Sequence, residues 1–170
     1  MIAVLDGEVD PDAATSQNPS IDEGDTTAAP PADSLVTLPA SLVKSDDTAV
    51  QMIRDGRFGD AITLIDSQLR NQPGRLQQRT FLKALAMLQI AEANRDRNAY
   101  LDAGLEFMRL VAMSRDGGAY LGPALLEAGV VHRAIGAEEV ADSLFEEASL
   151  LIDEQDEPDY YRRYAQLTGN

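Results

Sequence analysis

Pairs of carboxylates near the C-terminus are the side chains whose spacing comes closest to a catalytic arrangement. Glu146 and Glu147 are adjacent, and Glu138 and Asp142 stand four residues apart. Two carboxyl groups can act as general acid and general base when a pocket separates their pKa values. We expect these residues on a water-exposed helix face, which offers no such pocket. The sequence therefore predicts a protein that is not an enzyme, and a small helical enzyme using these pairs is an alternative.

Alternating acidic residues near the N-terminus suggest a metal site: Asp6, Glu8, Asp10 and Asp12. Such alternation is typical of calcium loops, because calcium prefers oxygen ligands. An EF-hand loop also needs glycine after its third ligand and an acidic residue at its twelfth position. Pro11 and Gln17 occupy those two positions here. We therefore predict no metal site in this segment.

The remaining residue types exclude most cofactor chemistry. The chain has no cysteine, and His132 is its only histidine. Disulfides, thiol nucleophiles, Cys-ligated zinc and sites built from several histidines are therefore excluded. Gly117-Gly118 is followed by Ala-Tyr, not by the Gly-Lys of a phosphate-binding loop. We predict no cofactor, and we expect His132 to be a packed helix residue.

Composition divides the chain into residues 1–45 and residues 46–170. The first region holds eight acidic residues, one basic residue and five prolines. It buries too little apolar surface to offset the cost of ordering its backbone, so we predict a flexible, disordered tail or linker. Two apolar stretches within it, at 1–5 and 35–43, are candidates for docking in an extended form, on this protein or on another.

In residues 46–170, apolar residues recur at helical spacing between breaks, and no alternating strand pattern of useful length appears. Ser45-Asp46-Asp47 is a plausible N-cap for the first helix. The pattern predicts six helices in three antiparallel pairs. A short seventh helix opens at Pro158 and carries Tyr160, Tyr161 and Tyr164, which we expect to cap the stack or to contact a partner. The six helices should end near Gly56, Pro73, Asn94, Gly117, Gly136 and Ile152.

Small and aromatic residues recur at equivalent places in these pairs. Ala61, Ala103 and Ala141 lie 42 and 38 residues apart, within the range of helical repeats. A turn glycine followed by small and large apolar residues marks the first and third pairs, at Gly56 and Gly136. The pattern resembles the tetratricopeptide repeat over about residues 45–153. The second pair lacks the turn glycine, and the spacing exceeds the family's usual 34 residues. A closed helical bundle is the alternative.

The resemblance implies an all-α fold: a short superhelix of about three antiparallel helix pairs with a C-terminal capping helix. In that family the first helices of the pairs line a concave groove, which receives a peptide or a helix from a partner. Some members hold a partner's C-terminal carboxylate with Lys and Asn, but the corresponding helices here offer Arg, and no suitable Asn pair. Helical spacing places seven residues on the groove wall: Arg54, Leu88, Glu92, Arg95, Leu126, Val130 and Arg133. Core-edge or solvated positions are the alternative interpretation of these residues.

Acidic and basic residues are unevenly distributed along the chain, which has a net charge of -15. Residues 54–115 hold ten basic and seven acidic side chains, whereas residues 138–159 hold ten acidic and none basic. This net charge argues against binding to nucleic acid or to anionic membranes. The acidic segment is either an ordinary solvated face or an electrostatic guide for a partner or for the tail.

These observations predict a non-catalytic protein-protein interaction module, acting as an adaptor, scaffold or accessory subunit of a larger assembly. Its partner is another protein that the sequence does not identify. The alternative is a structural subunit whose N-terminal tail is the binding element and orders on a partner. No apolar stretch reaches the length needed to span a bilayer. We expect a soluble chain, either cytoplasmic or, with an upstream signal or anchor, in the cell envelope.

Overall fold

The computed structural model describes residues 36–71, 74–114 and 117–169. Regular secondary structure in these ranges is entirely helical, which confirms the predicted all-α fold. The apolar stretch at 1–5 and the alternating acidic residues at 6–12 lie outside the described residues. The helices are α1 (Ala40–Val43), α2 (Thr48–Arg54), α3 (Phe58–Asn71), α4 (Leu76–Asn94), α5 (Arg97–Met113), α6 (Leu121–Ala134), α7 (Glu138–Ser149) and α8 (Pro158–Thr168).

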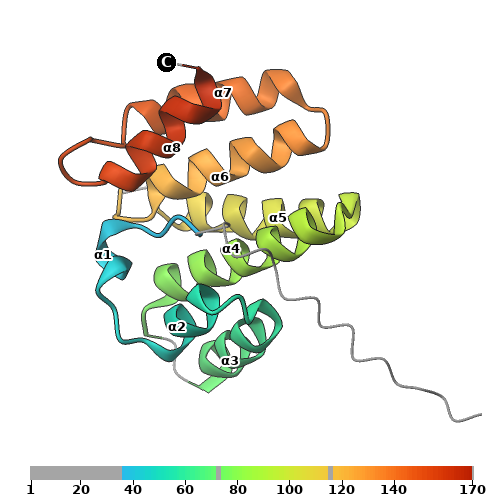
Figure 1. The fold of residues 1–170 in the computed structure, drawn as a ribbon, viewed down its shortest axis with the longest axis vertical. Helices are drawn as coiled ribbons and strands as arrows, with labels where there is room; N and C mark the ends of the chain where they lie inside the picture. Colours follow the sequence, from blue (N-terminus) through green and yellow to red (C-terminus); the bar gives the residue numbers. More distant parts are fainter. Residues whose placement is uncertain (1–35, 72–73, 115–116, 170) are drawn as a thin grey trace, which may run out of the picture.

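Helix hairpins are the building unit of the fold. The pairs α2–α3, α4–α5 and α6–α7 each pack together, and α3 packs on α4 as α5 packs on α6. Figure 1 shows these three hairpins stacked along the long axis of the molecule, with α8 on the last of them. The first helices of successive hairpins also touch, α2 with α4 and α4 with α6. The order of the stack is therefore the order of the sequence.

Each hairpin turns at a residue with a positive φ angle. Gly56 and Gly136 have φ angles of 73° and 85°, in the left-handed region that glycine adopts without steric cost. Arg95 occupies the same position in the middle hairpin with a φ of 52°. These three residues lie 39 and 41 residues apart, and each precedes the start of the next helix by two residues. The middle hairpin therefore makes the same turn without the glycine.

This register differs from the one that the small residues suggest. Counted from the start of each second helix, Ala61 and Ala141 are equivalent to Tyr100, three residues before Ala103. Ala103 is fully buried like the other two alanines, so its small size reflects burial at a different place on α5. The positive φ angle at the turn recurs more regularly along the three hairpins than the small residues do, although the sequence of the second pair does not show it.

Close helix crossings and an aromatic cluster join the hairpins. A Cβ atom on Gly129 of α6 would lie 2.5 Å from Cε1 of Phe145 on α7, so only glycine allows this crossing. The Phe81 ring of α4 stacks on Tyr120 at 5.5 Å between centroids and meets Phe107 and Tyr160 edge-on at 6.0 and 6.5 Å. The rings connect α4 to α5 and α8, giving one continuous core.

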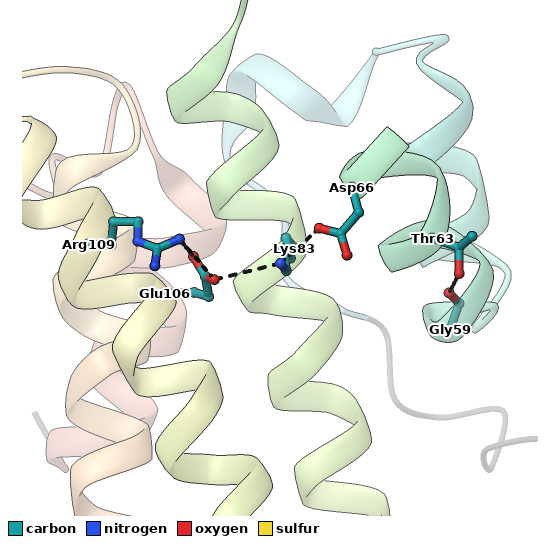
Figure 2. Close-up of polar contacts among 6 residues, drawn as sticks. All are labelled: Gly59, Thr63, Asp66, Lys83, Glu106 and Arg109. Atoms are coloured by element: carbon teal, nitrogen blue, oxygen red, sulfur yellow. Dashed lines mark hydrogen bonds and ion pairs between the residues drawn. The ribbon is translucent and has the colours of Figure 1, made fainter. Parts of the chain in front are cut away.

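An ion-pair network holds the first hairpin to the second. Lys83 of α4 lies between Asp66 of α3 and Glu106 of α5, with Nζ 2.8 Å from Asp66 Oδ1 and 3.7 Å from Glu106 Oε1 (Figure 2). Glu106 also pairs with Arg109 at 3.1 Å. The Lys83 and Glu106 side chains are mostly buried, at 20% and 14% exposed, so the network is shielded from water more than an ordinary surface pair.

The segment at residues 36–43, here called the strap, belongs to the packed unit. Leu38 and Leu42 are 5% and 2% exposed and join the core. The stretch at 35–43 is one of the two candidates for docking in an extended form, and its described residues 36–43 pack on this protein. Residues 40–43 do so as helix α1 and are not extended. Burial of a leucine side chain is worth about 1.5–3 kcal/mol, which offsets part of the cost of ordering the segment. Residues 36–45, which composition assigned to the tail, are thus continuous with the helical stack.

Candidate functional site

Besides its buried leucines, the strap is held through hydrogen bonds to its own backbone. Arg54 of α2 donates to the carbonyl oxygens of Leu42, at 2.9 Å, and of Val43. The Tyr160 hydroxyl of α8 donates to the carbonyl of Thr37 at 3.2 Å. The Glu157 carboxylate accepts from the backbone N–H of Ala40 at 2.8 Å. Because these bonds reach only main-chain atoms of the strap, they do not depend on its side chains.

The strap therefore spans the stack from its first hairpin to its last helix. Figure 1 shows the strap and α1 along one side of the molecule, leading down to α2. Arg54 belongs to α2 at one end of the stack, and Tyr160 belongs to α8 at the other. We call this side of α2, α4, α6 and α8 the strap face. The cap that we expected α8 to form is thus also an anchor for the N-terminal segment.

Tyr160 is fully buried and serves as a fixed donor. Its burial, reinforced by the negative charge of Glu127, raises the pKa of its hydroxyl well above the ordinary value. The phenol therefore keeps its proton at any physiological pH and can always donate to the strap. Tyr161 is 41% exposed and Tyr164 is half-buried, so the three tyrosines do not form one exposed aromatic patch.

Beside Tyr160 lies a buried ion pair between α6 and α8. Arg163 donates from Nε and Nη2 to the two carboxylate oxygens of Glu127, both at 2.8 Å. Glu127 has no exposed surface, and the Arg163 side chain is 26% exposed. A bidentate pair of this kind is geometrically specific. It fixes the orientation of α8 on α6, and so the position of Tyr160 under the strap.

Two cavities flank the strap. The smaller, of about 220 Å³, lies over α4 and α6 and is lined by Val36, Thr37, Leu85, Gln89, Glu92, Glu127 and Arg163. The larger, of about 630 Å³, is lined by Val36, Thr37, Leu38, Val43, Arg54, Asp159, Arg162, Arg163 and Gln166. Val36, Thr37 and Arg163 border both. A cavity of several hundred Å³ is large enough for side chains of a bound molecule.

Glu92 is the acidic group of the smaller cavity that lacks a cationic partner at ion-pair distance in the described residues. Partial burial, followed by repulsion from Glu127, raises the pKa of the Glu92 carboxyl. Arg163 and a hydrogen bond from Gln89, at 3.0 Å, act in the opposite direction. The cavity thus brings two carboxyl groups and one guanidinium together.

Of the seven residues expected on a groove wall, two lie at these cavities. Arg54 binds the strap, and Glu92 lines the smaller cavity. Leu88 and Leu126 have no exposed surface, so in this conformation they have nothing to offer a partner. Val130 packs half-buried against the core.

The other two predicted wall residues lie at the far ends of their helices. Arg95 is exposed at the hairpin turn after α4. Arg133 covers the Phe145 ring at 4.4 Å and donates to the Leu167 carbonyl at 2.8 Å. Its guanidinium is therefore engaged in holding α7 and α8 to α6. Neither arginine lines a cavity beside the strap.

Two lining residues of the smaller cavity are absent from the predicted set. Gln89 and Glu127 line the smaller cavity, next to the predicted Leu88 and Leu126. A step of one residue turns a helix by about 100°. Both α4 and α6 are apolar around most of their circumference, so periodicity alone did not identify the exposed side. One signal was available: Glu127 is an acidic residue inside the apolar run of α6, and a buried charge needs a partner.

The paired carboxylates of α7 do not converge on a cavity of the strap face. Glu138 and Asp142 are 65% and 70% exposed and pair with Arg133 at 3.7 and 3.5 Å. Glu146 is exposed, and Glu147 lies at the edge of a separate pocket on α7. His132 is half-buried, and within the described residues its Nδ1 atom has no hydrogen-bond partner.

Three comparisons with known proteins gave no match: no family model, no curated protein and no solved structure matches the chain. No three His, Asp or Glu side chains among the described residues are grouped so that they could hold a metal ion. No helix in the described part of the chain combines the length and apolar character that crossing a bilayer requires.

Proposed function

We propose that this chain is a non-catalytic protein-interaction module of the tetratricopeptide class, an adaptor or accessory subunit that binds an extended peptide segment of a partner on its strap face. The observation that carries this proposal is the strap itself. Side chains from both ends of the stack hold the strap by its main-chain atoms. The strap shows that this face holds a peptide main chain, and other polar side chains beside the strap would hold a second one in the same way.

The larger cavity is the place for the partner segment. It runs beside the strap, next to Arg54, and brings together Arg162 and Gln166, whose side chains can donate hydrogen bonds. The Arg162 side chain is 73% exposed, pairs with Asp159 and donates from Nε to the carbonyl of Pro158 at 3.4 Å. Main-chain carbonyls or a carboxylate of a partner would satisfy these donors. The partner would lie alongside the strap without displacing its buried leucines.

The test is a photo-reactive cross-linker in place of Gln166, in the full chain and in its native host. We expect a protein to be cross-linked from this position but not from the exposed Asp102 on α5, the matched control. The cross-linked segment, made as a synthetic peptide, should bind the full chain. The Arg162→Ala variant should weaken that binding about tenfold, the effect of one hydrogen bond from a charged donor.

The result also separates the proposal from its alternative, in which the N-terminal tail is the binding element. Removal of residues 1–35 leaves the strap in place. If the peptide still binds the shortened chain and still depends on Arg162, the strap face is the site. If binding disappears with residues 1–35 and is indifferent to Arg162→Ala, the tail is the binding element and the proposal fails.

A further inference from the structure

A third pocket, of about 390 Å³, lies where α5 ends, α6 begins and α7 ends. Its lining is mostly apolar, from Val111, Leu121, Leu125, Leu150 and Leu151. It shares no lining residue with the two cavities beside the strap. The pocket is therefore a separate feature of the surface, and a molecule could bind there without touching the strap face.

Two adjacent leucines at this pocket are left in water. Leu150 is 84% exposed and Leu151 is 50% exposed. Covering a leucine side chain is worth about 1.5–3 kcal/mol, so the pair would gain from contact with an apolar group. Ser114 lies on the same pocket, 1% exposed, and its hydroxyl has no hydrogen-bond partner among the described residues. The two leucines are exposed to water and the Ser114 hydroxyl lacks a hydrogen-bond partner in the described part of the chain, so a bound molecule would supply apolar contacts and a hydrogen bond.

The charge around the pocket indicates what kind of molecule covers it. The pocket borders the segment 138–159, which holds ten acidic and no basic residues. Glu147 is at its edge, and Asp153 and Glu154 follow the two leucines on the exposed surface. A second copy of this chain, with its own net charge of -15, would bring the same acidic segment to a two-fold contact. Like charges in such a contact would repel.

We propose that this pocket is a second docking site, which receives a leucine-sized side chain from a basic amphipathic helix of a partner protein. The apolar anchor fills the space between Leu125 and Leu151. Lysine or arginine side chains on either side of the anchor meet Glu147 and its acidic neighbours. Helices with an apolar stripe and a charged face commonly bind in apolar grooves in this way. The acidic segment of the sequence then acts as a guide to this pocket.

The test uses the full chain and a labelled helical peptide, with leucines at positions i and i+4 and lysines on the remaining face. We expect saturable binding at one site, measured by fluorescence anisotropy. Leu150→Ser and Leu151→Ser should each weaken it at least tenfold. Leu105→Ser is the matched control, because Leu105 is 69% exposed on α5 and does not line the pocket. This variant should bind like the wild type.

Two further peptides separate the apolar contribution from the electrostatic one. A peptide with serine in place of the leucines should bind at least tenfold more weakly, and one with glutamate in place of the lysines should not bind. Equal binding of the leucine-free peptide, or wild-type binding by Leu150→Ser, would overturn the proposal. So would a dimer of the full chain in sedimentation that Leu150→Ser dissociates, because a second copy would then be the occupant. Circular dichroism of each variant confirms that it is folded.

Discussion

The buried ion pair between Glu127 and Arg163 should respond unequally to the loss of either partner. Arg163→Met leaves the Glu127 carboxylate, which has no exposed surface, without the two donors that hold it at 2.8 Å. Breaking a buried pair in this way costs about 3–5 kcal/mol. Glu127→Met leaves Arg163, whose side chain is 26% exposed and can turn toward water. We expect about 2 kcal/mol for this variant, the cost of one unsatisfied buried group.

The double variant Glu127→Met/Arg163→Met should be more stable than Arg163→Met alone. Two methionines replace the pair with apolar groups of similar length, and such replacements of a buried pair are often neutral. With single-variant costs of about 3–5 and about 2 kcal/mol and a near-neutral double variant, the interaction free energy between the two sites should be about 5–7 kcal/mol. This exceeds the usual range for residues in contact, because each single variant leaves a buried group unpaired. The Arg163→Met variant alone should melt roughly 10 °C below the wild type, since a chain of this size loses about 2–4 °C per kcal/mol.

Urea unfolding followed by circular dichroism measures all four members of this cycle at one pH. Arg162→Met is the matched control, because its side chain is 73% exposed and its loss should change the free energy of unfolding by about 0.5 kcal/mol or less. Equal costs for the two single variants, adding up in the double variant, would show that the two side chains do not interact. The ion pair would then not be what orients α8 on α6.

Three smaller perturbations test other parts of the structure. Gly129→Ala should destabilise the fold by about 1–3 kcal/mol, because its Cβ atom would lie 2.5 Å from the Phe145 ring of α7. Gly59→Ala, with open space around it, is the control and should stabilise the fold by up to about 1 kcal/mol. A Gly129→Ala variant more stable than Gly59→Ala would contradict the close crossing of α6 and α7. Leu42→Ala should lower the free energy of unfolding in urea by about 2–5 kcal/mol. Val43→Ala, whose side chain is 44% exposed, should lower it little. Equally small losses for both variants would mean that the strap does not pack on the stack. Glu92 has its pKa raised by burial, so the folded state holds the proton more tightly, and wild-type stability falls as pH rises from the unfolded pKa through the folded one. Glu92→Gln should therefore be more stable than wild type at pH 7 and no more stable near pH 4, and a gain that is equal at both values would contradict this assignment.

Much of the fold could be read from local patterns. Asp47 caps α2 by accepting from the N–H of Ala49 at 2.9 Å, as the Ser-Asp-Asp sequence predicts. Gly56 and Gly136 end their helices with positive φ angles. Arg95 makes the same turn without a sequence signal, because a non-glycine residue can adopt this conformation when the surrounding hairpin over-determines it. Local signals therefore identified the helices, whereas only the structure shows the turn conformation of the middle hairpin.

The candidate site could be predicted only in part, since two of its features depend on contacts between distant segments. Tyr160 and Thr37 are 123 residues apart in sequence and meet through one hydrogen bond. The exposed side of α4 includes Gln89 because other helices cover its remaining sides, and no periodicity within α4 shows this. Helical spacing selected Arg54 and Glu92 together with five residues that do not line these cavities. Spacing gives the position of a residue on its own helix, and not which neighbouring helix covers it.

The sequence by itself determined that the described part of this protein is helical, that its helices are short and paired, and that its acidic residues gather near the C-terminus. These properties arise from helix propensity, spacing and capping, which act over a few residues. Tertiary structure decided that the strap at 36–43 packs on the stack, that Glu127 and Arg163 form a buried pair, and that Leu150 and Leu151 are exposed around a pocket. The reason is physical: burial of an apolar or charged side chain depends on which surfaces face each other in space, and chain neighbours do not carry that information.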